Sequence, residues 1–299
     1  MKINRIRQNV LPVLAAFIWG TAFVAQSVGA DYVEPFTFNT ARSAIAFLFL
    51  LVLCLVRRTA QKGIVERATK SWKDLAVGGT CCGVALTVAS FLQQKGLETT
   101  TSGKAGFITA LYIVIVPIAG IFLKKRAPRT IWISVALAVA GLYCLCITED
   151  FTITSGDFYV LLCAFCFSAH ILVIDFFTQR VDGVELSCAQ FLVVTVLSSI
   201  GMIATESPSL EALRFCIWPI LYVGIFSSGV AYTLQILAQK DSNPTVVTIL
   251  LSLESVFAVI SGAIILHQQM TAREYIGCVI MFAAVILAQI QLPEKKTTA

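Results

Sequence analysis

One carboxylate lies near the middle of a long apolar stretch of this chain. Glu254 is embedded in the run from about residue 244 to 266. A charge in hydrocarbon is costly, so such residues often mark a substrate or proton pathway. Glu254 could bind a substrate or exchange protons. It could equally be a structural carboxylate that is hydrogen-bonded to hydroxyls such as those of Thr248 or Ser252.

Three other polar side chains are set in apolar stretches. His170 could relay protons or bind a substrate near neutral pH, or it could be a buried, neutral, hydrogen-bonded histidine. Arg42 could meet an anionic group of a substrate, or it could pair with an acidic neighbour or a helix-end carbonyl. Lys104 lies at the end of its stretch, and we expect its ammonium to reach outward to the polar boundary. Glu254 and Arg42 are thus candidates for proton-coupling or structural roles.

Patterns typical of enzymes and metal sites are weak here. Cys163, Cys166 and His170 have the spacing C-x2-C-x3-H, but they share one helix face, whereas zinc sites usually draw ligands from several segments. The ten cysteines lie in or beside apolar runs, so we expect packing thiols and no disulfide framework. Neither H-E-x-x-H nor G-x-S-x-G occurs, and the stretch at 102–105 fails the phosphate-loop pattern. We predict no catalytic residue, no metal and no cofactor.

Helices that cross a bilayer must position these polar residues. The 299-residue chain is 58% hydrophobic and only 13% charged, well outside the averages of globular domains. Apolar runs of about 20 residues are long enough to span a membrane. We therefore predict an all-α integral membrane protein with ten transmembrane helices, near residues 9–29, 35–56, 75–96, 101–123, 130–147, 157–177, 185–204, 216–238, 244–266 and 272–291.

The ten runs form two sets of five, and the second set echoes the first. At an offset of 142, Gln93 matches Gln235 and Leu111 matches Leu253, whereas earlier in each half the offset is 148. Five is odd, so the second half must enter the membrane from the opposite side. We predict two inverted five-helix repeats, residues 1–150 and 151–299, an architecture typical of secondary transporters. The first run has a partner in the second half, so we expect it to be retained rather than cleaved as a signal peptide.

Basic residues gather on one side of this predicted arrangement. Of the 22 lysines and arginines, all but five (Arg42, Lys95, Lys104, Arg214 and Arg273) fall in the tails and loops on the side of the N-terminus, which leaves 17 there. Basic loops favour the cytoplasm, so both termini are predicted to be cytoplasmic in a multi-pass protein of the plasma membrane. Topology accounts for these charges, and we expect no nucleic-acid partner.

Three segments resemble a known family. Residues 14–23 (LAAFIWGTAF) look like the first-helix Trp-Gly signature of EamA-type transporters in the drug/metabolite transporter superfamily. Residues 102–112 (SGKAGFITALY) are similar to that family's SAGNAAFLTALYP segment, and residues 253–258 (LESVFA) to its LEPVFA segment. Arg42 stands where the family often has arginine. The resemblance extends through both halves of the chain.

The departures from the family pattern carry expectations of their own. Ile113 and Ser255 each replace a proline, so the family's kinks after Tyr112 and Glu254 should be absent or weaker here. Lys104 adds a charge where a small polar residue is usual, and Phe167 replaces a second-half tryptophan that would match Trp19. A glutamate at position 254 is common in family members with different substrates, which favours a structural or conformational role.

The resemblance implies a central cavity between the halves, lined by helices one, three, six and eight. Mapped onto this chain, it implies these substrate-binding residues: Trp19, Phe23, Gln26, Gln93, Phe167, His170, Tyr232 and Gln235.

The predicted function is secondary transport, with export of small metabolites such as amino acids by alternating access. The alternatives are efflux of drugs or cations, a nucleotide-sugar-like carrier, and, from a different class, a membrane-embedded enzyme that would use Glu254 and His170 as acid and base. The expected partners are a small-molecule substrate and the lipid bilayer. Coupling to protons, and the choice between monomer and homodimer, stay open.

Overall fold

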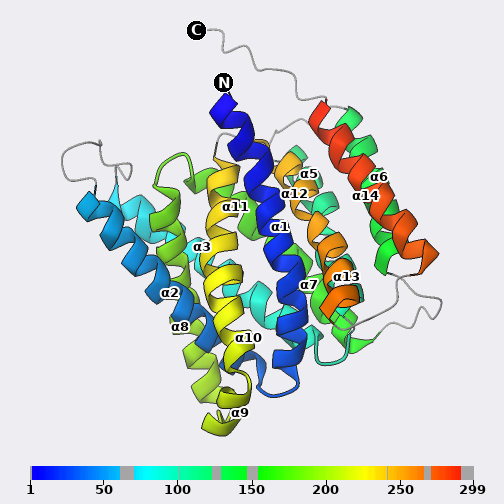
Figure 1. Cartoon of the computed structure of the whole chain (residues 1–299). Coiled ribbons are helices and arrows are strands. Elements are labelled where there is room, and N and C mark those ends of the chain that lie inside the picture. Colours follow the sequence, from blue (N-terminus) through cyan, green and yellow to red (C-terminus); the bar gives the residue numbers. More distant parts are fainter. Residues whose placement is uncertain are drawn as a thin grey trace.

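The computed structural model is a bundle of helices (Figure 1) and describes residues 2–60, 71–100, 102–122, 129–146, 154–240, 242–265 and 271–290. The boundary predicted between the repeats at 150/151 lies outside these residues. So do many of the basic loop positions, among them Lys62, Arg67 and Lys124.

Within its described residues, the first half contains six helices that make up five spans. The first three spans are α1 (Lys2–Ala30), α2 (Pro35–Ala60) and α3 (Trp72–Gly96). The fourth span is divided into α4 (Ser102–Thr109) and α5 (Tyr112–Phe122), and the fifth is α6 (Arg129–Cys146).

The second half follows the same plan with more interruptions. Spans six and seven are α7 (Ser155–Phe177) and α8 (Gly183–Thr205), followed by the short α9 (Leu210–Phe215). Span eight runs through α10 (Ile217–Tyr222), a π-helix η1 (Val223–Ala231) and α11 (Tyr232–Gln239). Span nine is divided into α12 (Pro244–Leu251) and α13 (Leu253–Ile265), and span ten is α14 (Ala272–Ile290).

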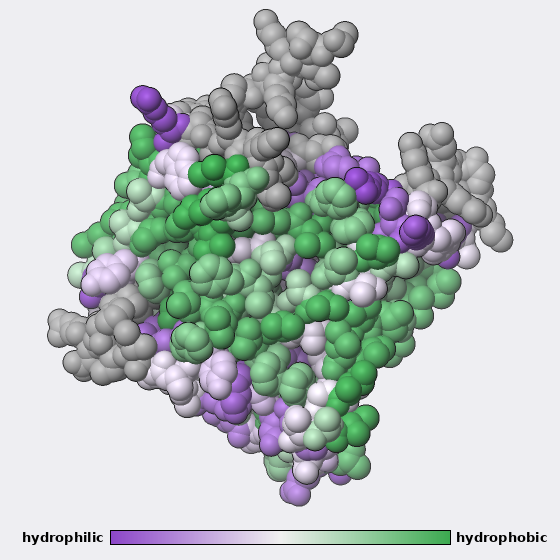
Figure 2. All heavy atoms as spheres, turned by 180° about the vertical axis from the view of Figure 1, so that it is seen from behind, coloured by the Kyte–Doolittle hydropathy of each residue, from purple (hydrophilic) through white to green (hydrophobic). Residues whose placement is uncertain are grey.

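The surface of the bundle is that of a membrane protein. Within the described residues, eight helical stretches are long and apolar enough to cross a bilayer, and α6 contributes a shorter apolar helix. A broad apolar belt covers the middle of the molecule, with polar residues toward its two ends (Figure 2). Side chains such as Leu48, Val52 and Val56, one turn apart on α2, are more than half exposed, as expected where lipid replaces water. The predicted fold class, two inverted repeats of five transmembrane helices, is confirmed.

The two halves interlock rather than lie apart. Among the described helices, the most extensive contacts include α2 with α8, α3 with α7, α6 with α14, and α1 with α13. Each of these pairs joins one helix of the first half to one of the second. A buried apolar cluster runs through both halves, from Ala15 and Leu86 to Ile249 and Val285. The residues between the halves are therefore held by helices from both.

Polar contacts fix α2 against α8 at both ends. At one end, the backbone N–H groups of Phe36 and Thr37 donate to the Glu206 carboxylate at 2.7 and 2.6 Å. At the other end, Arg57 forms a two-pronged ion pair with Asp182, at 3.0 and 3.3 Å. Burial opposes the charge of Asp182, but Arg57 and backbone N–H groups of α8 hold its pKa below the ordinary value. These contacts hold the two helices together at both ends.

Small residues let α3 approach α8 closely. A Cβ atom at Gly79 would lie 2.5 Å from Cβ of Ala189, and one at Gly83 would lie 2.5 Å from Cβ of Val193. Both distances are shorter than atoms tolerate, so the two glycines are required by the spacing of the helices. The pair is a small-x-x-x-small motif that joins the two halves.

We predict that Gly83→Ala destabilises the protein by about 1–3 kcal/mol, because the added methyl group overpacks this contact. Gly106→Ala is the matched control, since a Cβ there would meet only Oγ of Ser255, at 3.5 Å. Thermal melting of the purified protein in detergent measures both changes. Equal melting temperatures for the two variants would refute the close contact.

Candidate functional site

Spans four and nine are both broken near their centres, at matching positions. The fourth is interrupted between Thr109 and Tyr112, and the ninth at Ser252. At the repeat offset of 142, residue 110 corresponds to residue 252. Both breaks precede Tyr112 and Glu254, and the expectation of absent or weaker kinks after these two residues stays a prediction. At the break in span nine, Ser252 Oγ donates a hydrogen bond of 2.8 Å to the carbonyl of Ile249, and such local bonds bend helices.

The two breaks bring Tyr112 and Glu254 together. The Tyr112 hydroxyl donates a hydrogen bond of 3.0 Å to Oε1 of Glu254, and both side chains are buried. The partner of the carboxylate is thus a tyrosine of the other half. The hydroxyls of Thr248 and Ser252, suggested by the sequence, bond instead to carbonyls of their own helix. Tyr112 and Glu254 are also 142 residues apart, so they occupy equivalent places in the two repeats.

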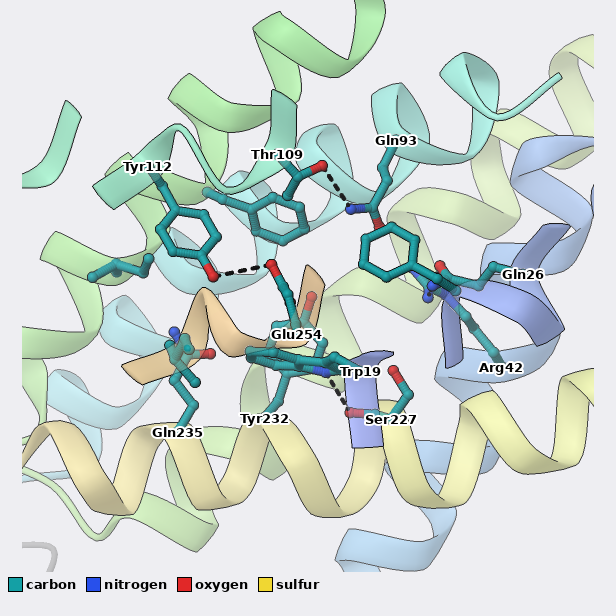
Figure 3. A pocket seen from close by; sticks show the side chains of 14 residues that line it. Trp19, Gln26, Arg42, Gln93, Thr109, Tyr112, Ser227, Tyr232, Gln235 and Glu254 are labelled. Carbon is teal, nitrogen blue, oxygen red and sulfur yellow. Dashed lines mark hydrogen bonds between the residues drawn. The ribbon is translucent and has the colours of Figure 1, made fainter. Parts of the chain in front are cut away.

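A cavity opens beside this pair (Figure 3) and contains about 480 Å³ of space between atoms, including the part that is open to solvent. Seven of the eight residues predicted for substrate binding line it, and only His170 does not. Both candidates for proton coupling, Arg42 and Glu254, line it too. The complete lining is Trp19, Phe23, Gln26, Arg42, Gln93, Thr109, Tyr112, Phe167, Ile171, Ser227, Tyr232, Gln235, Leu251 and Glu254.

Aromatic side chains form much of the cavity wall. The rings of Trp19 and Tyr232 meet edge to face with centroids 4.8 Å apart. The Trp19 indole also donates to the carbonyl oxygen of Ser227 at 3.3 Å (Figure 3). Ser227 belongs to η1, whose π-helical turns bring this carbonyl to the cavity. Short π-helical segments are frequent at functional sites.

His170 lies behind the wall rather than in it. The side chain is fully buried, and its Nε2 lies 3.0 Å from Oε1 of Gln190 in α8. Its ring meets the edge of Tyr232, with centroids 5.9 Å apart. Cys163 and Cys166 are free thiols, and no group of three His, Cys, Asp or Glu side chains that could hold a metal occurs among the described residues. A direct contact of His170 with substrate remains a prediction.

Arg42 reaches the cavity from α2. Its Nη1 donates a hydrogen bond of 3.0 Å to Oε1 of Gln26, and its guanidinium lies 5.9 Å from the centroid of the Phe38 ring. The side chain is 5% exposed. Within the described part of the chain, no carboxylate forms an ion pair with it. Neither alternative suggested by the sequence, an acidic partner or a helix-end carbonyl, is found there.

The ammonium of Lys104 pairs with a carboxylate of the other half. Lys104 Nζ lies 2.5 Å from Oδ2 of Asp157, at the first turn of α7, and the side chains are only 16% and 7% exposed. Thr100 donates a further bond of 2.9 Å to Asp157. The expectation that Lys104 extends outward was wrong, because Asp157 of the neighbouring helix offers its ammonium a buried carboxylate. The contact ties α4 to α7.

Sequence reasoning did not name five of the lining residues as binding residues: Thr109, Tyr112, Ile171, Ser227 and Leu251. A signal for Tyr112 was present in the sequence, because the offset of 142 makes it equivalent to Glu254. Equivalent residues of two inverted repeats lie close together when they are near the twofold axis that relates the repeats. No such signal exists for Ser227, because its place depends on the π-helix. Leu251 and Ile171 are indistinguishable in sequence from other core aliphatic residues.

A sequence profile described as the EamA-like transporter family matches this chain twice, at residues 8–147 and 154–289. The chain belongs to this family. The two matches cover the two halves in which the helices repeat. As a member of this family it is a transporter and a multi-pass membrane protein, as the resemblance predicted.

Several relatives of this EamA-family protein carry transporter names. The chain is 30% identical over 297 residues to an uncharacterized transporter of Archaeoglobus fulgidus, covering 97% of this chain and 88% of that one. It is 24% identical over 296 residues to a chloroplastic WAT1-related protein of Arabidopsis thaliana, covering 93% of this chain and 68% of that one. A solved crystal structure, 18% identical, shares the fold with a TM-score of 0.78 and covers 95% of this chain and 96% of the other.

We predict that Lys104 and Asp157 are energetically coupled in this transporter by about 1–3 kcal/mol. A double-mutant cycle with Lys104→Met and Asp157→Asn, read by thermal or denaturant unfolding, measures this value. The control pair is Lys95 and Glu98, which are 2.6 Å apart but 40% and 31% exposed, so their coupling should stay below about 0.5 kcal/mol. Equal coupling in the two pairs would contradict a buried tie between the halves.

Proposed function

We propose that this protein is a secondary transporter that exports small metabolites such as amino acids by alternating access. The observation that carries the proposal is a cavity lined by both halves, beside matching breaks in two helices. Secondary transporters of inverted-repeat folds bind their substrates near the midplane, between the repeats and at interrupted helices. The mixture of aromatic rings and amides in this cavity suits a small organic solute with a polar head.

The proposed location is the plasma membrane, with both termini in the cytoplasm. The first residues of α1 and the last of α14 lie at the same end of the bundle (Figure 1). Arg57 and Arg58 are on the cytoplasmic side under this proposal, where basic residues are favoured. The pair of Lys104 and Asp157 is then on the outer side.

Three alternatives differ in how well the geometry supports them. Efflux of a drug or cation is favoured by one observation, the carboxylate of Glu254 among aromatic rings. The membrane-enzyme alternative loses its acid–base pair, because Glu254 bonds to Tyr112 and His170 bonds to Gln190 outside the cavity wall. A nucleotide-sugar-like carrier has no observation of its own in its favour. Metabolite transport therefore remains the leading proposal.

The first test is flux through the purified protein in lipid vesicles. We expect counterflow of at least one class in a panel of amino acids, organic cations and nucleotide sugars. Blocking the cavity by Gln93→Trp should abolish that flux, whereas Phe226→Trp, a change on the exposed surface of η1, should leave it intact. Absence of flux for the entire panel, with protein that is folded by circular dichroism, would contradict the proposal.

The second test concerns proton coupling at Glu254. We expect Glu254→Gln to remove the response of transport to an imposed pH gradient, because the amide cannot exchange a proton. Glu185→Gln, which changes a carboxylate outside the cavity, is the control. The measurement is substrate flux across vesicles over a range of internal and external pH. Normal flux with unchanged pH dependence in Glu254→Gln would rule out coupling at this residue.

A further inference from the structure

Arg42 is a buried cation whose only polar side-chain contact in the described structure is a neutral one. Its guanidinium has five N–H donors, yet it donates a single hydrogen bond, to Oε1 of Gln26. The ring of Phe38, at 5.9 Å from the guanidinium carbon, cannot replace a counterion. Buried charges in proteins are normally paired. An anion is thus the missing partner.

This unpaired cation faces the cavity rather than lipid or a loop. Arg42 is one of the lining residues, and Figure 3 draws it and Gln26 toward one end of the cavity. It lies seven residues after Pro35, the start of α2, so it is about 10 Å inside the helix end. A guanidinium at this depth cannot reach the polar boundary as a surface arginine does. A carboxylate fits its planar fork with two parallel hydrogen bonds.

A second polar group in the cavity, the side-chain amide oxygen of Gln235, also lacks a partner, but it requires a hydrogen-bond donor instead of an acceptor. Oε1 of Gln235 is buried and accepts no hydrogen bond from any of the described residues. Gln235 and Tyr112 lie toward the other end of the cavity from Arg42 in Figure 3, and the Glu254 carboxylate lies between the two ends. An N–H or O–H donor on the solute would satisfy Gln235. The solute would therefore need a hydrogen-bond acceptor at the Arg42 end of the cavity and a donor at the Gln235 end.

The same charges argue against a simple cation as the solute. An organic cation could sit beside Glu254, but that carboxylate already accepts a bond from Tyr112. Arg42, in the same low-dielectric cavity, would repel such a cation. A solute with a carboxylate removes the cost of the unpaired guanidinium instead of adding to it.

We propose that Arg42 is the carboxylate-binding residue of this transporter, so that its substrates are small solutes that carry a carboxylate and a hydrogen-bond donor, with an apolar body against the aromatic wall. The donor meets Gln235. This inference rests on the proposed function, and it narrows that function from metabolites in general to carboxylates.

The experiment compares carboxylic acids with their primary amides. The probes are the common L-amino acids and simple aliphatic and aromatic carboxylic acids, each beside its amide. Counterflow in vesicles measures transport, and the shift of the melting temperature with millimolar probe measures binding independently of transport. The variants are Arg42→Gln and Arg42→Lys, with Arg214→Gln as the control. Arg214 is exposed on α9, and its loss changes the net charge equally.

We expect the protein to transport the carboxylic acids but not their primary amides. In Arg42→Gln, transport and binding of the acids should fall by about tenfold or more, because a charge-assisted bond to the carboxylate is lost. Arg42→Lys should retain an intermediate level, since it keeps the charge without the fork, and it serves as the test if Arg42→Gln does not fold. Arg214→Gln should behave as the unaltered protein.

Two other results separate this inference from the proposed function. If amides or cations are transported, and are transported equally well by the Arg42→Gln variant, the assignment of Arg42 as the carboxylate-binding residue is overturned, while the proposed transporter function stands. If no probe moves but acids alone raise the melting temperature through Arg42, the carboxylate site stands while transport fails. If acids neither move nor raise the melting temperature, the inference is overturned.

Discussion

The hydrogen bond between Tyr112 and Glu254 is the contact around which the two halves are arranged. In an inverted repeat, equivalent positions meet only near the twofold axis that relates the halves. Tyr112 and Glu254 are equivalent and lie within 3.0 Å of each other, so they mark that axis. Both stand next to a helix break, and the cavity opens beside them. The site, the breaks and the symmetry thus share one location.

This location explains why the two repeats must differ in sequence. Two identical carboxylates facing each other across an axis would repel, and two identical phenols would leave acceptors unused. A tyrosine opposite a glutamate supplies one donor and one acceptor. Other mismatched positions follow the same logic around the cavity. Trp19 and its counterpart Phe167 both line the wall, but only the tryptophan can donate to the Ser227 carbonyl.

The remainder of the bundle has to satisfy polar groups without help from water. Inside lipid, an unpaired backbone or side-chain group is expensive. In the described structure, contacts that join the halves satisfy such groups. Glu206 accepts a backbone N–H at the start of α2, Asp182 pairs with Arg57, and Asp157 pairs with Lys104. Arg42 and Gln235 are the exceptions beside the cavity. A buried group left unsatisfied beside a cavity is where a ligand is to be sought.

The amino-acid sequence by itself determined the architecture. Apolar runs of sufficient length, repeated at a nearly constant offset, are enough to predict ten spans and their inversion, because a bilayer leaves a chain few other choices. The family motifs then placed seven of the eight proposed binding residues on one cavity. The pattern of apolar residues along a helix is a local property, so it can be read directly from the sequence.

Only the tertiary structure decided which polar groups meet. That Lys104 turns inward to Asp157, that Glu254 bonds to Tyr112 rather than to Thr248 or Ser252, and that His170 lies behind the wall all depend on neighbours far away in the chain. The helix breaks without proline and the π-helix that brings in Ser227 are equally non-local. Such features arise because a buried polar group takes the best partner that packing brings within reach, and packing is set by the whole bundle.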